Sequence, residues 1–250
     1  MLIYGRNAVL EALRSGGVEQ VLVARGIERA MLKELEAAAA RAGVPLAMLP
    51  RIELDRALKT THHQGVAAEL PEVKTTSLEQ LLAQGRAAGG RLLLVLLDQL
   101  TDPRNLGAIV RSAEALGSHG MVMEERRSAP LSAVAVKASA GATSLLPIAV
   151  VTNLPRAIEQ LKEQGVWVYG AAPLGSDPTA VDAASVDWDR DTALVIGSEG
   201  SGMRRLVRER CDGMVGIPMS GRIGSLNAAV AAGILLYAVQ RGRSGSGSGM

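Results

Sequence analysis

The sequence of 250 residues contains no Phe, and Trp and Tyr bring the aromatic content to only 2%. At a usual share of about 4%, Phe would occur on the order of ten times. The chain also carries Ser-Gly repeats at 244–249, which behave as a flexible coil and are typical of an added linker. We therefore expect an engineered sequence in which Phe has been replaced, with residues 244–250 as a tail.

Cysteine and long apolar runs are also scarce. Cys211 is the single cysteine, so an internal disulfide is excluded. No apolar run reaches the roughly 18 residues of a membrane helix, and no N-terminal stretch has the organisation of a signal peptide. With 48% hydrophobic and 21% charged residues, the chain has enough apolar material for one large core or two smaller ones. We expect a folded, cytoplasmic protein without membrane contact.

Lysine is rare beside arginine, with 5 Lys against 22 Arg and a net charge of +2. Arg suits bidentate phosphate contacts and stacking on bases, which favours an RNA partner. A GC-rich coding bias, which also favours Ala and Gly, explains the same excess equally well. Charge alone therefore does not establish RNA binding.

A metal site is not expected. His62 and His63 are adjacent on a predicted strand and point to opposite faces, with no Cys or cluster of acidic residues nearby.

The first part of the chain has the pattern of a small α/β domain. Helices are expected at 5–13, 29–42 and 53–58, and strands at 20–24, 46–49 and 65–69. We assign 1–72 to this domain and 73–90 to a linker and connecting helix. In that linker, Ser77 and Gln80 form a capping box that opens a helix over 78–88.

From residue 91 to 243, predicted strands and helices alternate. Strands are expected at 92–97, 120–123, 148–151, 166–171, 193–196 and 214–217, and helices at 103–116, 132–139, 154–164, 203–209 and 226–240. Such alternation indicates an α/β domain with a mostly parallel sheet covered on both faces.

Two common nucleotide-binding signatures are missing from this domain. The segment after Leu97 lacks the GxGxxG turn of a dinucleotide-binding fold, and the turn at 197–202 lacks the Lys-Ser/Thr ending of a P-loop. Dinucleotide and ATP binding are therefore disfavoured.

Three segments of the second domain carry polar residues in loops that lead into helices: DQLTDPRNLGAIVRSAEALG (98–117), LVIGSEGSGMRRL (194–206) and IPMSGRIGSLNAAVAAGI (217–234). In the first, Asp102 and Pro103 resemble an N-cap and first helical residue. The second forms a turn after a buried strand, at the sheet edge where α/β proteins place ligands. Each segment also has an ordinary explanation, such as a solvated Arg, an acid at a helix N-terminus or a capped helix.

Taken together and in this order, the three segments resemble the motifs of the SpoU (TrmH-like) RNA ribose 2'-O-methyltransferases. LIYGRNAVLEAL (2–13) and THHQGVAAEL (61–70) resemble the ribosomal-protein-like substrate-binding domain joined to many of these enzymes. Over its full length the chain is most similar to the branch of the family that methylates a guanosine of 23S rRNA.

This resemblance implies a SPOUT-type parallel sheet with a deep trefoil knot that binds S-adenosyl-L-methionine, preceded by the small domain. It also implies RNA as substrate, without a metal, and a homodimer through the knotted domain with shared active sites. The last predicted helix fits a dimer because Ala231, Ala232, Ile234, Leu235 and Tyr237 give it apolar surface on several sides.

The resemblance also implies the site residues. The catalytic residues would be Asn105, Arg111, Glu199, Ser225 and Asn227, converging around the methyl donor. The cofactor would be bound by Ala171, Gly197, Ser198, Glu199, Gly200, Ile217, Met219, Ser225 and Leu226. Arg111 would assist removal of the ribose proton, but a free guanidinium, with a pKa above about 12, is a poor base. We favour a role of Arg111 in positioning an RNA phosphate or hydroxyl.

Two neighbouring positions depart from the family pattern. After Asn227 the family typically has Val-Ser, whereas this chain has Ala228 and Ala229. A lost hydroxyl removes a hydrogen bond worth about 1 kcal/mol. Two alternatives therefore stay open: a non-catalytic or engineered SpoU-like scaffold that binds RNA or cofactor, and a methyltransferase that acts on tRNA.

Overall fold

The computed structural model describes residues 1–71, 73–175, 177–222 and 224–245, which form two compact units. The smaller unit comprises Met1–Val73 with Ser132–Lys137, and the larger comprises Lys74–Leu131 with Ala138–Met250. No helix in these described ranges is long and apolar enough to cross a membrane. Of the expected tail, 246–250 lie outside the described residues, whereas Ser244 and Gly245 continue the last helix instead of starting a coil.

The smaller unit is built on a four-stranded sheet with the order β1-β4-β2-β3. Its strands are β1 (Leu2–Tyr4), β2 (Gln20–Ala24), β3 (Leu46–Leu49) and β4 (Val66–Glu69), and its helices are α1 (Arg6–Ser15), α2 (Arg29–Ala42) and α3 (Arg51–Leu58). β2 and β3 are parallel, and the other pairings are antiparallel. Helices α1 and α2 pack against Val21 and Val23, whereas Leu54 of α3 packs with Ala67 on the opposite face. The predicted small α/β domain is thus confirmed, with β1 as an added strand.

The two adjacent histidines do not lie on a strand as expected. They lie in the turn before β4, because Gln64 and Gly65 have left-handed backbones, with φ of 56° and 76°. His63 is fully buried, its Nε2 lies 2.6 Å from Asp55 Oδ1, and its Nδ1 accepts a hydrogen bond from the Gly65 N–H at 2.9 Å. His63 therefore closes this turn. Within the described ranges, no group of three His, Cys, Asp or Glu side chains is arranged to hold a metal ion.

The larger unit contains an eight-stranded sheet in which all neighbouring strands are parallel. The strand order is β10-β12-β9-β11-β6-β7-β8-β5. The strands are β5 (Thr75–Thr76), β6 (Leu93–Asp98), β7 (Gly120–Glu124), β8 (Ile148–Val151), β9 (Trp167–Ala171), β10 (Ala180–Asp182), β11 (Thr192–Gly197) and β12 (Gly213–Gly216). This confirms the α/β fold class with a parallel sheet. The path of the chain through a trefoil knot stays a prediction.

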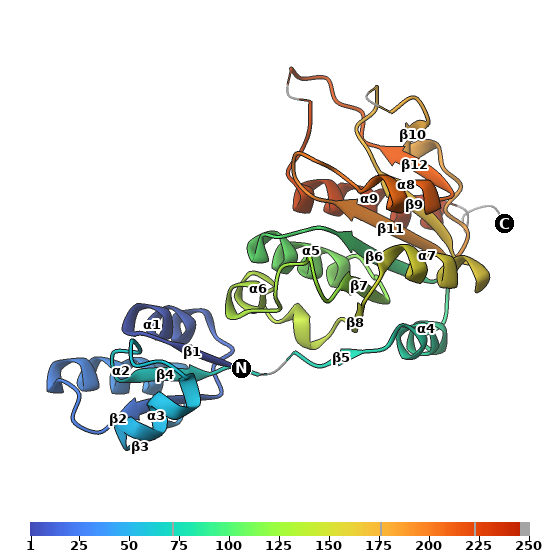
Figure 1. The fold of residues 1–250 in the computed structure, drawn as a ribbon. Coiled ribbons are helices and arrows are strands. Elements are labelled where there is room, and N and C mark those ends of the chain that lie inside the picture. Colours follow the sequence, from blue (N-terminus) through green and yellow to red (C-terminus); the bar gives the residue numbers. More distant parts are fainter. Residues whose placement is uncertain (72, 176, 223, 246–250) are drawn as a thin grey trace. The chain divides into compact units, whose positions relative to one another are not determined.

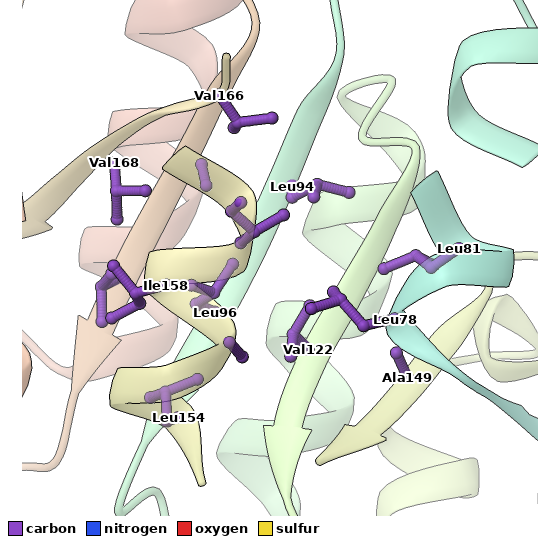
Figure 2. Close-up of a cluster of buried hydrophobic side chains, with 14 of the residues drawn as sticks. Leu78, Leu81, Leu94, Leu96, Val122, Ala149, Leu154, Ile158, Val166 and Val168 are labelled. Carbon is purple, nitrogen blue, oxygen red and sulfur yellow. The ribbon is translucent and has the colours of Figure 1, made fainter. Parts of the chain in front are cut away.

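Helices cover both faces of this sheet (Figure 1). They are α4 (Leu78–Ala87), α5 (Pro103–Ala115), α7 (Leu154–Glu163), α8 (Arg205–Arg210) and α9 (Ala228–Gly245). Helix α6 (Ala133–Ala138) belongs, except for its last residue, to the smaller unit. Helices α4, α7 and α8 share one apolar cluster with alternate residues of the strands, such as Leu94 and Leu96 of β6. Figure 2 shows Leu154 and Ile158 of α7 in this cluster. Helices α5 and α9 pack together, and they contact β7 and β11.

Local signals in the sequence explain where the helices begin. The Ser77 hydroxyl accepts from the Gln80 N–H, and the Gln80 side chain accepts from the Ser77 N–H, so the expected capping box is present. Asp102 accepts from the Arg104 N–H at 2.8 Å, with Pro103 at the first helical position. Residues 74–90, expected as a linker with a connecting helix, form β5 and α4 of the larger unit.

Candidate functional site

The three motifs meet at one edge of the larger sheet because its strands are parallel. In the pairing of β11 with β6, Gly197 lies opposite Asp98, so the first two motifs leave the sheet side by side. The third motif follows β12, two strands away from β11 in the sheet. The carboxyl ends of parallel strands are where open α/β folds bind ligands.

A tight loop carries the acid of the second motif. A Cβ atom on Gly197 would lie 2.5 Å from the carbonyl carbon of Gly202, so only Gly fits where the loop closes on itself. The Ser198 N–H donates to the Gly202 carbonyl at 3.0 Å, and the Gly202 N–H donates back at 3.1 Å. The closed loop holds Glu199 away from the sheet with an exposed side chain.

Three predicted catalytic residues, one from each motif, form a hydrogen-bonded cluster. Asn105 donates from Nδ2 to Glu199 Oε1 at 2.7 Å. Asn227 donates from Nδ2 to the same oxygen at 2.5 Å and to Asn105 Oδ1 at 3.1 Å. Asn105 is only 9% exposed, so its amide has little access to water. We call Asn105, Glu199 and Asn227 the amide–carboxylate cluster.

Asn227 also caps the last helix. Its Oδ1 accepts from the Ala229 N–H at 2.9 Å and from the Val230 N–H at 3.2 Å. Because the helix occupies the oxygen, the Nδ2 group is the one turned toward Glu199. This cap explains why α9 begins at Ala228, two residues later than expected, and it links the helix start to the cluster.

Beside this cluster lies a cavity of about 680 Å³. All nine predicted cofactor-binding residues line it: Ala171, Gly197, Ser198, Glu199, Gly200, Ile217, Met219, Ser225 and Leu226. Its walls combine apolar side chains, such as Leu235, with backbone at the ends of β9, β11 and β12. The volume lies in the range of small-molecule sites, roughly 300–1,000 Å³.

Two further residues of the cavity were not anticipated from the sequence. Asp177 is only 3% exposed, and its Oδ2 lies 2.7 Å from Arg208 Nη2. Thr179 donates to Asp177 Oδ1 through its hydroxyl and its N–H, and the hydroxyl bond contributes most to a lowered pKa of this carboxyl. A charged pair therefore lies at a wall that is otherwise neutral apart from Glu199.

Arg111 neither lines the cavity nor takes part in the amide–carboxylate cluster. It lies six positions after Asn105 on α5, which at 100° per residue puts the two about 120° apart around the helix. Its side chain is exposed and has no hydrogen bond or ion pair with any described residue. Helical periodicity thus puts Arg111 on another face of α5 than Asn105, and its convergence with the other four residues stays a prediction.

Ser225 and the two unusual alanines have clear places in the structure. Ser225 is exposed and lines the cavity, and its hydroxyl has no hydrogen-bond partner in the described part of the chain. Ala228 is buried beside the cavity, and Ala229 is half-buried in the first turn of α9. The Ala229 backbone still completes the cap on Asn227, so this cap does not need a hydroxyl at either position.

A buried ion network next to the site was also missed. Arg204, directly after the second motif's loop, lies against the carboxylates of Asp98 and Glu124 at the ends of β6 and β7. The sequence signal that could have indicated it is Asp98, a carboxylate at the end of a continuous apolar strand. A buried charge requires a partner, so a cation could have been expected nearby.

Comparisons with known proteins identify the family of this chain. Residues 92–237 match the SpoU rRNA methylase family, and residues 2–76 match the substrate-binding domain of RNA 2'-O ribose methyltransferases. The chain is 39% identical over 244 residues to YacO of Bacillus subtilis, which bears the name of a TrmH family tRNA/rRNA methyltransferase, covering 97% of this chain and 96% of that protein. It is 44% identical to a protein of Mycolicibacterium vanbaalenii named as an uncharacterized tRNA/rRNA methyltransferase, covering 97% of this chain and 76% of that protein.

Solved structures give the same result. The SpoU methyltransferase AviRb from Streptomyces viridochromogenes, in complex with AdoMet, is 27% identical, with a TM-score of 0.64 over 98% of this chain and 91% of that one. The A. aeolicus TrmH/SpoU tRNA modifying enzyme is 30% identical, with a TM-score of 0.57 over 68% and 86%. With two family matches, full-length relatives and the three motifs joined at one cavity, the chain belongs to the SpoU family of S-adenosylmethionine-dependent RNA methyltransferases.

Proposed function

We propose that this protein methylates the 2'-OH of a ribose in RNA, with a guanosine of 23S rRNA as its target. The observation that carries the proposal is the amide–carboxylate cluster, which joins all three motifs through hydrogen bonds, with Glu199 and Asn227 lining the cavity. A substrate of this kind agrees with the expected cytoplasmic location. Methylation of tRNA is the competing possibility.

The cavity fits S-adenosylmethionine in size and chemistry. Ile217, Met219 and Leu226 supply apolar contacts for a nucleoside, and the backbone around Gly197 and Gly200 approaches closely because these residues lack side chains. The polar groups at the wall suit the charged amino-acid end of such a molecule. When bound, the cofactor supplies an electrophilic methyl group on a sulfonium. We assign its binding to the nine residues predicted from the sequence.

The chain's own part in the reaction is alignment. Asn105 and Asn227 donate to one oxygen of Glu199, which holds the second-motif loop and the start of α9 in fixed relation beside the cavity. The other carboxylate oxygen of Glu199 is not part of these bonds. Methyl transfer between two bound molecules depends on such fixed geometry, because most of the achievable rate gain comes from orientation.

We further propose that Arg111 acts on the active site of a second copy of the chain. Arg111 does not line the cavity of its own chain, is exposed, and has no partner among the described residues. The neighbouring Ser112 packs closely on Gly233 of α9, whose exposed face carries Val230, Ile234 and Tyr237. Three exposed apolar residues at i, i+4 and i+7 are typical of a helix face covered by a partner. A homodimer through α9 would bury this face and place Arg111 near the partner's cavity.

The Arg111→Ala variant tests the function. S-adenosylmethionine binding by titration calorimetry is expected to stay within about threefold of the wild type, while methyl transfer to 23S rRNA fragments falls at least about 100-fold, as for a lost transition-state contact. The matched control is Arg156→Ala, which removes an exposed Arg of α7 and should leave both measurements unchanged.

The same assay decides the target. Primer extension at low nucleotide concentration locates the 2'-O-methyl group on 23S rRNA or on tRNA. Methylation of tRNA alone would replace the rRNA proposal. Wild-type protein that binds S-adenosylmethionine but methylates neither RNA would favour a binding scaffold, and equal transfer by wild type and Arg111→Ala would remove the role given to Arg111.

A further inference from the structure

Arg204 joins the end of the second-motif loop to two strands of the sheet. Its Nε donates to Asp98 Oδ1 at 2.6 Å, and its Nη2 lies 2.6 Å from the same oxygen. Its backbone N–H donates to Asp98 Oδ2 at 2.7 Å. Nη2 also lies 2.9 Å from Glu124 Oε2. One residue thus contacts the ends of both β6 and β7.

Asp98 is the first residue of the first motif and also contacts the second motif. It is fully buried, it lies opposite Gly197 in the strand pairing, and it ends the strand that leads to Asn105. The loop carrying Glu199 therefore begins beside the Asp98 backbone and ends on the Asp98 carboxylate through Arg204. Because both ends of the loop meet at this residue, the position of Glu199 relative to Asn105 depends on the contact between Arg204 and Asp98.

Glu124 extends the network to a helix. Its Oε2 faces Arg204, and its Oε1 accepts from the Leu154 N–H, at the first residue of α7, at 2.9 Å. Glu124 is 4% exposed. Strand β7 and helix α7 are thereby connected to the end of the second-motif loop.

The charges of this network make Arg204 hard to replace. Two buried carboxylates share one guanidinium that is 20% exposed. Burial acts to lower the pKa of Arg204, but hydrogen bonds to Glu124 and Asp98 outweigh it, so the pKa is raised and the guanidinium stays charged. Removal of one partner of a buried pair leaves an uncompensated charge, which destabilises the arrangement around it.

We propose that Arg204 is a positioning residue for methyl transfer: by bridging Asp98 and Glu124 it sets the second-motif loop so that Glu199 meets Asn105 and Asn227. This inference rests on the proposed function. Arg204 does not line the cavity and does not belong to the amide–carboxylate cluster, so it acts through the loop and not by touching substrate or cofactor.

The test compares Arg204→Met with Arg243→Met, a matched control in the same unit. Arg243, near the end of α9, also has an extensively bonded guanidinium, which donates to the backbone carbonyls of Arg91, Leu92, Trp188 and Arg190. These carbonyls lie before β6 and β11, at the sheet edge opposite the site. Both substitutions remove a guanidinium with several partners, but only Arg204 is close to the second-motif loop.

Three measurements distinguish a positioning role of Arg204 from a general loss of folding stability. For Arg204→Met we expect kcat to fall about 100-fold with KM for RNA within about threefold, as for a small misplacement of reacting groups. We expect affinity for S-adenosylmethionine to fall about tenfold and hydrogen exchange of residues 197–203 to speed up. Arg243→Met is expected to lower the melting temperature while leaving these three readouts near the wild-type values. Arg204→Lys keeps the positive charge but has a single ammonium group in place of the planar guanidinium. Its kcat should therefore lie between those of Arg204→Met and the wild type.

Two outcomes would overturn the inference. One is an Arg204→Met protein with kcat within threefold of the wild type and unchanged exchange in the loop, and the other is an equal effect of Arg243→Met on kcat. Should Arg204→Met not fold, Glu124→Gln replaces it: its Oε1 still accepts from Leu154, but its NH₂ group then faces the guanidinium. A normal kcat in that variant contradicts the inference. If the wild type methylates no RNA, the proposed function fails. Hydrogen exchange of residues 197–203 and the affinity for S-adenosylmethionine then still test whether Arg204 positions the loop.

Discussion

At the scale of single residues, Asn227 connects the candidate site to the start of a helix. Its oxygen caps α9 and its nitrogen donates to Glu199, so the same side chain holds the helix start and the second-motif loop. Glu199 in turn receives two amide donors on one oxygen. Hydrogen bonds to a charged acceptor contribute about 1.5–3 kcal/mol each, more than neutral ones. The cluster is therefore sensitive to loss of the carboxylate.

Glu199→Ala is predicted to lower methyl transfer by about 10- to 100-fold, because Asn105 and Asn227 lose their shared acceptor and the loop loses its link to the other motifs. Glu199→Gln retains an acceptor oxygen without the charge and should lose less. Single-turnover methyl transfer at saturating cofactor measures both. Glu163→Ala removes an exposed carboxylate of α7 and serves as control. Full activity of Glu199→Ala would show that the cluster is dispensable.

At the scale of elements, short sequence signals determine where helices begin. The capping box at Ser77 opens α4, which covers β7 and β8 through Leu78, Leu81 and Leu82. The Gln80 side chain also accepts from the Thr76 hydroxyl at 2.7 Å, next to the short strand β5. A local pattern of four residues thus attaches the edge strand of the sheet to its covering helix.

Ser77→Ala is expected to destabilise the larger unit by about 1 kcal/mol, the usual effect of a lost N-cap. The substitution leaves the Gln80 N–H without its acceptor at the start of α4. Urea unfolding followed by circular dichroism measures the change. Gln84→Ala, at an exposed position of the same helix, should change stability by less than about 0.5 kcal/mol. Equal stability of Ser77→Ala and the wild type would mean that α4 is held by packing alone.

At the scale of the whole molecule, the proposed dimer would complete the active site. In sedimentation experiments the wild type is expected to be a dimer. Ile234→Glu, which puts a charge on the exposed face of α9, should shift it to monomers with little methyl transfer. Leu206→Glu alters a comparably exposed apolar residue on α8 and should stay dimeric. An active wild-type monomer would contradict the dimer.

Mixed dimers give a further check on shared sites. Co-expressed Arg111→Ala and Glu199→Ala chains should form heterodimers in which one of the two sites has both residues intact, restoring about a quarter of wild-type activity for random pairing. If each site used residues of a single chain, every site in the mixture would lack one residue. Activity no higher than that of either variant alone would then be observed.

The sequence by itself predicted most helices and strands and the order of the three motifs, because these depend on residues that are neighbours in the chain. Apolar runs gave the buried strands, and the cap at Asp102 and the capping box at Ser77 gave the helix starts. The strands β1, β5 and β10 were missed, because two or three residues carry no periodicity and are strands only through pairing with β4, β8 and β12. The motifs likewise predicted Asn105, Glu199 and Asn227, which the structure brings together.

Only the tertiary structure decided what depends on distant pairs. Arg204 and Asp98 lie 106 positions apart, and no local pattern indicates that these two charges meet below the site. The exposure of Arg111 outside the cavity of its own chain likewise could not be predicted from its place in a motif. The motifs, through their family resemblance, predicted the candidate site residues, whereas long-range packing decided that Asn105, Glu199 and Asn227 meet.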